Sequence, residues 1–400
     1  MIVRYASILI RALTIFLYPY IYTVDGIFSI TIIGYFYTFL IAPVQIYSQY
    51  SVYNEIKSIP LKKGLNNNTK WFLSIIFLSF VTRGLINNPE FIFNQIDTLL
   101  IFSTAFLLKE NSEGYYKARK IEMYKYANYM QYLVTPIIFL ITTLILFSLK
   151  FYEGSIYSIS TFLSFLMPYF IIRFNKKIDI SLENNKKLFK ELKIIRKEKN
   201  INKRVIFSTI LIYLLPAFFF IMGGRFFGNE YKQIFIALFF AQKLVDFISP
   251  GFNFFENMYP YKIKKVSRRG FSAINFFVGK VVKLQFKLNI FIVSMLTILL
   301  IIFYLFSKNL TFLDTDVILY TLLFSSTMLT INCYQGHDLV ISSFSPNALI
   351  KIDFLVLILA LVFLSISIYY SLPTLIIVSP LLIIFLRRIL SVRALKLNIF

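Results

Sequence analysis

A lysine and an aspartate lie in the middle of the apolar stretch 234–259, within the sequence QKLVDF. Lys243 is nine residues past the start of this stretch, about 13 Å into a helix and close to the midplane of a bilayer. Asp246 shares its face, and Pro250 leaves the carbonyl of Asp246 without an N–H partner. Because a charge at this depth costs about 2.5 to 3.5 kcal/mol, both side chains should face a bundle interior. They predict either contact with a charged cargo or coupling ion, or a structural pair that is neutralised.

Other polar residues within apolar stretches are further candidates for cargo contact. Arg11 is a candidate cavity cation, although its side chain is long enough to extend to the headgroups. Gln45 and Gln49, one turn apart, are suited either to sugar hydroxyls or to bonds with neighbouring helices. Arg83 is a candidate cargo contact or interfacial anchor. Asp97, across a short turn from it, is a candidate coupling group or charge partner of Arg83.

The composition predicts a membrane protein. Hydrophobic residues make up 58% of the 400 residues and the mean hydropathy is +0.71, well above the values of soluble chains. One cysteine, Cys333, and one histidine, His337, are too few for a Cys/His metal site, and no nucleotide-binding Gly-x4-Gly-Lys-Ser/Thr loop is present. The net charge is +23, but the sequence contains no separate folded basic domain that could bind nucleic acid, so we do not expect a nucleic-acid partner. We therefore expect no enzyme, cofactor or metal.

Apolar stretches of spanning length recur along the whole chain, and we predict about twelve transmembrane helices. They cover residues 5–22, 28–53, 71–86, 92–109, 128–149, 155–172, 206–223, 232–259, 288–307, 316–336, 352–370 and 372–386. The first stretch lacks a small-residue cleavage site and is expected to be retained as a helix. With a cytoplasmic N-terminus, 35 of the 42 basic residues fall on cytoplasmic segments, as the positive-inside rule requires. Both termini are therefore predicted to be cytoplasmic.

The chain is predicted to consist of two six-helix lobes. The lobes are residues 1–174 and 206–390, joined by a basic cytoplasmic linker, 175–205, and followed by a cytoplasmic tail, 391–400. Each half opens with a span, a Gly-containing turn and a long span that carries a proline, Pro43 or Pro250. A six-plus-six repeat is typical of transporters whose halves rock around a central cavity.

Three segments resemble a known family of transporters. They are DGIFSITIIGYFYTFLIAPVQIYSQYSVYNEIKS, FSTAFLLKENSEGYYKARKIEMYKYANYMQYLVTPIIFLI and LLPAFFFIMGGRFFGNEYKQIFIALFFAQKLVDFISPGFNFFENMYPYKIKK. They are similar to the second, the fourth and fifth, and the seventh and eighth helices of the Wzx-type polysaccharide flippases of the MATE/MOP superfamily. The resemblance covers the whole chain in length, span count and lobe order.

This resemblance implies an all-α integral membrane fold with two lobes in a V around a central cavity, placed in the bacterial inner membrane. The implied function is translocation of undecaprenyl-pyrophosphate-linked oligosaccharide units, for O-antigen or a related surface polysaccharide, from the cytoplasmic to the periplasmic leaflet by alternating access. The implied partners are the lipid-linked oligosaccharide and membrane lipids. A polysaccharide polymerase and a chain-length regulator are candidate partners.

Two other kinds of transporter fit the same pattern. One is a multidrug or other small-molecule exporter of the same superfamily, and the other is the permease subunit of an ABC exporter. An exporter of cationic drugs would favour acidic residues in its cavity, whereas Arg11, Arg83 and Lys243 are basic. The balance of charge favours an anionic cargo. It does not decide whether the chain works with a partner ATPase, as the permease subunit of an ABC exporter would.

The predicted topology can be tested with reporter fusions. Fusions after Lys199 and Lys265 should report the cytoplasm, and fusions after Asn88 and Gly228 should report the periplasm, because the basic segments stay inside. A periplasmic signal from either of the first two fusions would contradict the twelve-span assignment.

Overall fold

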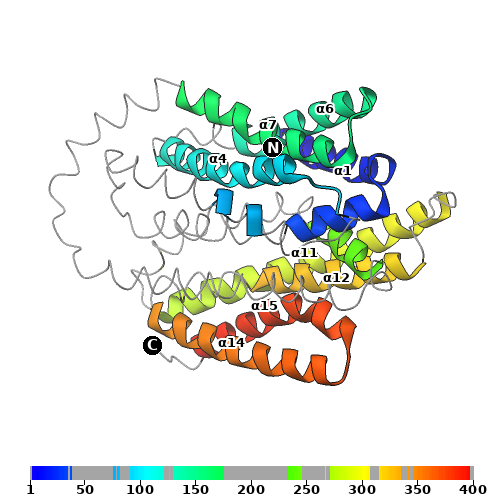
Figure 1. Cartoon of the computed structure of the whole chain (residues 1–400). Coiled ribbons are helices and arrows are strands. Elements are labelled where there is room, and N and C mark those ends of the chain that lie inside the picture. The colour runs from blue at the N-terminus through cyan, green and yellow to red at the C-terminus, as the bar shows by residue number, and fades with distance from the viewer. Residues whose placement is uncertain are drawn as a thin grey trace. The chain divides into compact units, whose positions relative to one another are not determined.

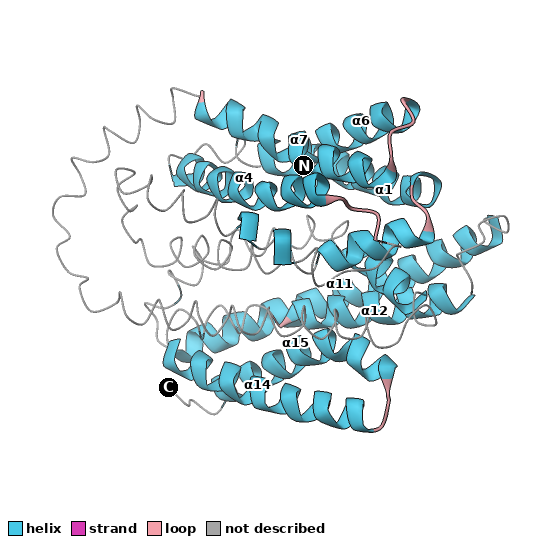
Figure 2. Ribbon diagram, viewed as in Figure 1, coloured by secondary structure: helices cyan, strands magenta, loops and turns pink. Residues whose placement is uncertain are grey.

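The structure, a computed structural model, consists of helices and short connecting loops over the residues that it describes. It describes residues 2–34, 37, 75–77, 79–81, 91–120, 126, 129–174, 233–245, 266, 271–306, 315–334, 341 and 346–396. Figure 2 shows helices and connecting loops, and no strand, over these ranges. The expectation of an all-α protein is confirmed.

The chain divides into two compact units, an N-terminal unit, Met1–Lys199, and a C-terminal unit, Asn200–Phe400. Figure 1 shows the helices of both units, coloured along the chain. The division falls inside the predicted linker, residues 175–205. None of those residues is described, so the lobe boundaries themselves stay a prediction.

The described helices of the N-terminal unit differ in length, and two segments of it, Met130–Ser148 and Glu153–Arg173, are long and apolar enough to span a bilayer. They are α1 (Ile2–Ile21), the short helix Val24–Gly34, α4 (Gln95–Lys120), the π-helix η2 (Met130–Val134), α6 (Thr135–Ser148) and α7 (Glu153–Arg173). Helix α7 packs against both α4 and α6 (Figure 1). Its buried face consists mostly of small residues: Gly154, Ser158, Ser160, Thr161 and Ser164. Small side chains let helix backbones approach closely in a bilayer, which has no hydrophobic force to hold helices together.

Proline disturbs two helices of this unit. Pro168 lies inside α7, where it removes one backbone donor and leaves the carbonyl four residues back without its helical partner. In the same turn, the carbonyl of Phe165 accepts a hydrogen bond of 2.9 Å from Asn111 Nδ2 of α4. At the other site, Thr135 donates its N–H to the carbonyl of Met130, five residues back, directly before Pro136. The backbone is therefore widened into a π-helix at the start of α6.

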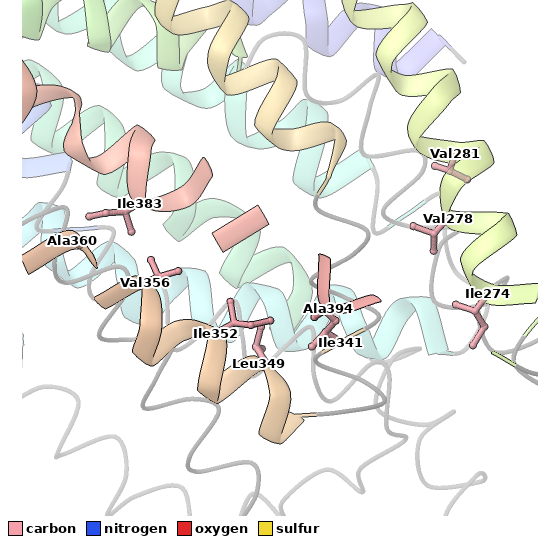
Figure 3. Close-up of a cluster of buried hydrophobic side chains, with 10 residues drawn as sticks. All are labelled: Ile274, Val278, Val281, Ile341, Leu349, Ile352, Val356, Ala360, Ile383 and Ala394. Atoms are coloured by element: carbon pink, nitrogen blue, oxygen red, sulfur yellow. The ribbon is translucent and has the colours of Figure 1, made fainter. Parts of the chain in front are cut away.

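The described helices of the C-terminal unit are the helix Gln233–Val245, α11 (Phe271–Phe306), α12 (Thr315–Cys333), α14 (Pro346–Tyr369) and α15 (Pro373–Lys396). Helix α14 packs against α15, and α11 against α12. An apolar cluster, drawn in Figure 3, draws side chains from three helices: Ile274, Val278 and Val281 of α11; Leu349, Ile352, Val356 and Ala360 of α14; and Ile383 and Ala394 of α15. The residues of α11 and of α14 recur every three or four positions, and Ile383 and Ala394 of α15, eleven positions apart, share one face, so each helix buries one stripe.

Two helices end in the same left-handed turn. After α6, Lys150 has φ 57°, its N–H donates to Phe147, and the N–H of Phe151 donates to Leu146. After α14, Ser371 has φ 50° and makes the equivalent bond to Ile368, while Leu372 donates to Ser367. Both are Schellman motifs, which satisfy the last carbonyls of a helix. They occupy corresponding places, between the fifth and sixth helices of each predicted lobe, and so support the internal repeat.

Several helices match the predicted spans closely, and three are longer, among them α4, which continues to Lys120 where the predicted span ended at 109. Among the described residues, five helices are long and apolar enough to cross a bilayer: Met130–Ser148, Glu153–Arg173, Ser272–Ile298, Asp316–Cys333 and Ala348–Tyr369. Helix α11 begins at Phe271, where the predicted span began at 288, and α15 continues to Lys396, where the predicted span ended at 386. The prediction ended each span at its basic residues. The helices continue through those lysines and arginines, since a helix need not end where the hydrocarbon layer ends. The total of twelve stays a prediction.

Gly154 should not tolerate a side chain. A Cβ added there would lie 2.5 Å from the carbonyl oxygen of Ile92, which belongs to backbone and cannot swing away. We expect Gly154→Ala to lower the free energy of unfolding by about 1 to 3 kcal/mol through overpacking. The change in thermal unfolding midpoint of the purified protein measures this.

Gly279→Ala is the matched control, because nothing lies within 4 Å of a Cβ at that helical position. Alanine is favoured over glycine in a helix by about 0.5 to 1 kcal/mol, so this variant should be neutral or more stable. Equal destabilisation by the two substitutions would contradict the close approach at Gly154.

Candidate functional site

Lys243 lies on a helix that is largely buried within the C-terminal unit. Every residue from Ile234 to Ala241 is buried, and Lys243 follows within one turn and is partly buried. Its ammonium nitrogen lies 5.2 Å from the centre of the Phe239 ring, a cation–π contact within the same helix. The ring therefore stabilises the charge in a largely apolar setting. Asp246, its predicted partner, and Pro250 lie outside the described residues.

Arg11 lies at mid-length on α1, which packs against η2 and α6 in the N-terminal unit. Its side chain is partly buried, and its Nε atom is shielded from solvent. This favours an inward position over extension to the headgroups. Gln45, Gln49 and Arg83 lie outside the described residues, so their roles stay predictions.

Asp97 is buried at the start of α4, where local donors surround its carboxylate. It forms a capping box with Asn94: its N–H donates to Asn94 Oδ1 at 2.8 Å, and its Oδ2 accepts from the Asn94 N–H at 3.3 Å. Its Oδ1 accepts from the hydroxyl of Ser158 on α7 at 2.6 Å. Asp97 therefore joins α4 to α7 through neutral donors. Pairing with Arg83 is not tested, because Arg83 is not described.

Sequence reasoning missed a second carboxylate in this unit, Glu153. Its Oε2 accepts hydrogen bonds of 3.0 Å from both the N–H and the hydroxyl of Thr23. Because Glu153 is the first residue of α7, its charge also suits the positive end of the helix dipole. Glu153 therefore ties the turn after α1 to the start of α7. The sequence signal was an acidic residue at a helix start, which is too common to specify a partner 130 positions away.

Sequence reasoning also missed a buried ion pair between α14 and α15. Arg387 Nε lies 2.8 Å from Asp353 Oδ1, and Arg387 Nη2 lies 3.4 Å from Asp353 Oδ2. Asp353 is 2% exposed and Arg387 7% exposed, and the neighbouring Arg388 is buried as well. The last predicted span ends at residue 386, directly before Arg387 and Arg388. Helix α15 continues past that position, and both arginine side chains are buried there.

The antiparallel hairpin explains why these two residues meet. Asp353 precedes the end of α14 by sixteen residues, and Arg387 follows the start of α15 by fourteen, which are about 24 Å and 21 Å along the two helices. Each charge also lies on the apolar stripe of its own helix, one turn from Leu349 and Ile383 respectively. A charged residue in line with the apolar positions of a helix is therefore the sequence pattern that could have predicted this ion pair.

The described residues hold no group of three or more His, Cys, Asp and Glu side chains suited to a metal ion. Cys333, at the end of α12, is buried as a free thiol and lies 2.7 Å from Asn289 Nδ2. The same amide nitrogen donates to the carbonyl of Leu329 at 2.7 Å. Asn289 and Cys333 therefore serve helix packing between α11 and α12.

Solved structures of transporters share this helical arrangement. A MATE transporter in its bent conformation matches with a TM-score of 0.63 and 14% identity, covering 98% of this chain and 93% of the other. A eukaryotic MATE transporter matches with a TM-score of 0.58 and 11% identity, over 99% and 92% of the two chains. The chain has the MATE fold.

A third match with this fold is a MOP superfamily transporter from Pyrococcus furiosus, with a TM-score of 0.58, 13% identity and coverage of 100% and 95%. Its binding pocket is described as reversed in polarity, suggesting a different function for that protein. No family model and no curated protein matches the chain. The MATE fold and the apolar helices make this a multi-pass membrane protein, and the resemblance found in the sequence is confirmed at the level of the MATE/MOP fold.

Removing one partner of the Asp353–Arg387 pair should destabilise the protein, whereas replacing both partners by apolar residues should be tolerated. Asp353→Ala leaves Arg387 buried without its carboxylate, and we expect a loss of about 3 to 5 kcal/mol in the free energy of unfolding. Replacing both residues by apolar ones of similar volume, Asp353→Leu with Arg387→Met, should recover most of that loss. Thermal unfolding midpoints of the three proteins in the same detergent measure it. If the double variant is as unstable as Asp353→Ala, the pair is not the source of the effect.

Proposed function

We propose that this protein is a flippase that moves polyprenyl-pyrophosphate-linked oligosaccharide units across the bacterial inner membrane, for O-antigen or a related surface polysaccharide. The proposal combines the MATE fold, which belongs to transporters, with the sign of the charges inside the helices. It also retains the resemblance of the sequence to Wzx-type exporters. The observation that carries it is Lys243, a partly buried cation on a largely buried helix.

The charges inside the two units support an anionic cargo. Arg11 and Lys243 are partly buried on helices that also bury apolar neighbours. The acidic residues are engaged locally: Asp97 by Ser158 and Asn94, and Asp353 by Arg387. A pyrophosphate in a low-dielectric cavity needs positive partners, and charge-assisted hydrogen bonds are about twice as strong as neutral ones. The partly buried cations are the groups proposed for the phosphates, because they carry the opposite charge.

The mechanism follows from the cost of desolvation. A phosphate headgroup that crosses hydrocarbon alone meets a large barrier, which a polar cavity between two lobes lowers. In the proposed cycle Lys243 holds the pyrophosphate near the midplane while access alternates between the two faces. Phe239 limits the cost of the partly buried ammonium before cargo arrives, because its ring already stabilises the charge. Arg11 and Arg83 are proposed as further cations, and Gln45 and Gln49 as partners of sugar hydroxyls.

Coupling and partners complete the proposal. Asp97 and Asp246 are proposed as coupling groups or charge partners, since carboxylates within a bundle can exchange a proton or hold a cation. A polysaccharide polymerase and a chain-length regulator are proposed as partners that use the translocated unit. No catalytic residue, cofactor or metal is part of the proposal.

An exporter of cationic drugs shares the same fold, and the Pyrococcus protein supports pocket polarity as the property that separates functions within it. Deletion of the gene, followed by analysis of lipid-linked sugars on each face of the inner membrane, separates the two. For a flippase, we expect units to accumulate on the cytoplasmic face with unchanged drug sensitivity. Units that still reach the outer face, with no redundant exporter present, overturn the proposal. Increased drug sensitivity with normal lipid intermediates favours the drug exporter.

Lys243 should be needed for transport and not for insertion. Lys243→Ala should lower translocation about tenfold to a hundredfold at a normal protein level, because a hydrogen bond to a charged group is worth about 1.5 to 3 kcal/mol. Lys243→Arg should retain part of the activity, since the charge survives. Lys351→Ala, which removes a lysine from an exposed position on α14, is the control and should transport normally. Restored export on adding Asp246→Ala to Lys243→Ala would show a purely structural pair instead.

A further inference from the structure

Helix α11 is longer than a membrane crossing requires. Its 36 residues extend about 54 Å, whereas the hydrocarbon layer is about 30 Å thick. Counted back from Phe306, twenty residues reach Lys287, so the remaining part of the helix, from Phe271, lies beyond the hydrocarbon. That part carries Lys280 and Lys283, and Lys287 lies at its boundary; we call these three residues the lysine stripe.

The lysine stripe lies on the outward face of α11. The buried face carries Ile274, Val278 and Val281 and continues to Asn289. At 100° per residue, the three lysines fall within one arc of about 60°, nearly opposite the middle of that buried face. All three are exposed. The positive face of α11 therefore points away from the protein core. Figure 3 shows the opposite face, with the buried side chains of Ile274, Val278 and Val281.

Nothing acidic within the described chain neutralises the stripe. No carboxylate of the described residues forms an ion pair with these lysines. The sequence has no Asp or Glu between Glu256 and Asp314 at all, while eight basic residues lie between positions 262 and 287. A neutral or cationic partner would find no attraction here.

Apolar side chains share the face with the lysines. Leu284, between Lys283 and Lys287, is 48% exposed, and Phe291, one turn past Lys287, is 65% exposed. An aqueous polyanion would leave both side chains in contact with water or its own charges. A phospholipid matches the whole pattern, because its headgroup lies at the level of the lysines and its acyl chain lies along Phe291.

From this arrangement we propose that the lysine stripe of α11 is a docking site for the headgroup of an anionic phospholipid. Each lysine near a negatively charged membrane surface is worth about 1 kcal/mol, which corresponds to about a fivefold preference. The site is independent of the transported cargo and holds whether this protein is a flippase or a drug exporter. It would fix the level of α11 in the bilayer and adjust the protein to the lipid composition around it.

Fluorescence quenching by lipids with brominated acyl chains tests the site. Phe291→Trp is placed in a Trp71→Phe background, so that the reporter is the single tryptophan of the chain. The protein is reconstituted in bilayers of phosphatidylglycerol and phosphatidylcholine, with either lipid brominated. We expect phosphatidylglycerol to bind beside this reporter at least about fivefold more tightly than phosphatidylcholine, and the preference to fall as salt screens the charges.

Replacing Lys280, Lys283 and Lys287 together by glutamine should bring the preference close to one. The control replaces Lys186, Lys187 and Lys190 by glutamine, which removes the same charge from the predicted linker, and should leave the preference intact. Equal binding of the two lipids with the lysines present overturns the proposal, even if the triple variant fails to fold. Loss of the preference in the control variant, or displacement of the lipid by inorganic pyrophosphate, also overturns it.

Discussion

A charged or hydrogen-bonding group inside a bilayer must find its partner within the protein, because hydrocarbon offers none. Two buried carboxylates, one in each unit, meet this constraint with short, local bonds. In the N-terminal unit, Asp97 accepts from Ser158 and Asn94 and so joins α4 to α7. In the C-terminal unit, Asp353 and Arg387 neutralise each other between α14 and α15. The packing of the helices depends on these bonds, since apolar side chains have the same affinity for lipid as for one another.

The same constraint explains why one charge can be functional while its neighbours are structural. A carboxylate held by two or three donors has little capacity left for a cargo, and Asp97 and Asp353 are of this kind. The ammonium of Lys243 contacts the ring of Phe239, and a phosphate oxygen would be a stronger partner for it than a ring.

The ends of the helices follow a different rule from their middles. Helix α11 continues beyond the hydrocarbon and carries exposed lysines, whereas α15 continues with buried arginines. Both extensions are basic in the sequence, yet the lysines of one are exposed and Arg387 of the other meets Asp353. Only the packing of the neighbouring helix distinguishes these environments. The Schellman turns at Lys150 and Ser371 show the opposite case, in which backbone geometry alone ends the helix in both halves.

The sequence by itself determined that this is an all-α membrane protein, approximately where its helices lie, and its likeness to MATE/MOP transporters. Hydropathy and the position of basic residues are sufficient for these conclusions, since the bilayer imposes them on each segment separately. Only the tertiary structure decided which charges meet. Asp353 and Arg387 are 34 positions apart, Asp97 and Ser158 are 61 apart, and Glu153 and Thr23 are 130 apart. Such pairs depend on the antiparallel register and rotation of two helices, and a one-residue rotation of about 100° would separate them without changing the hydropathy of either helix.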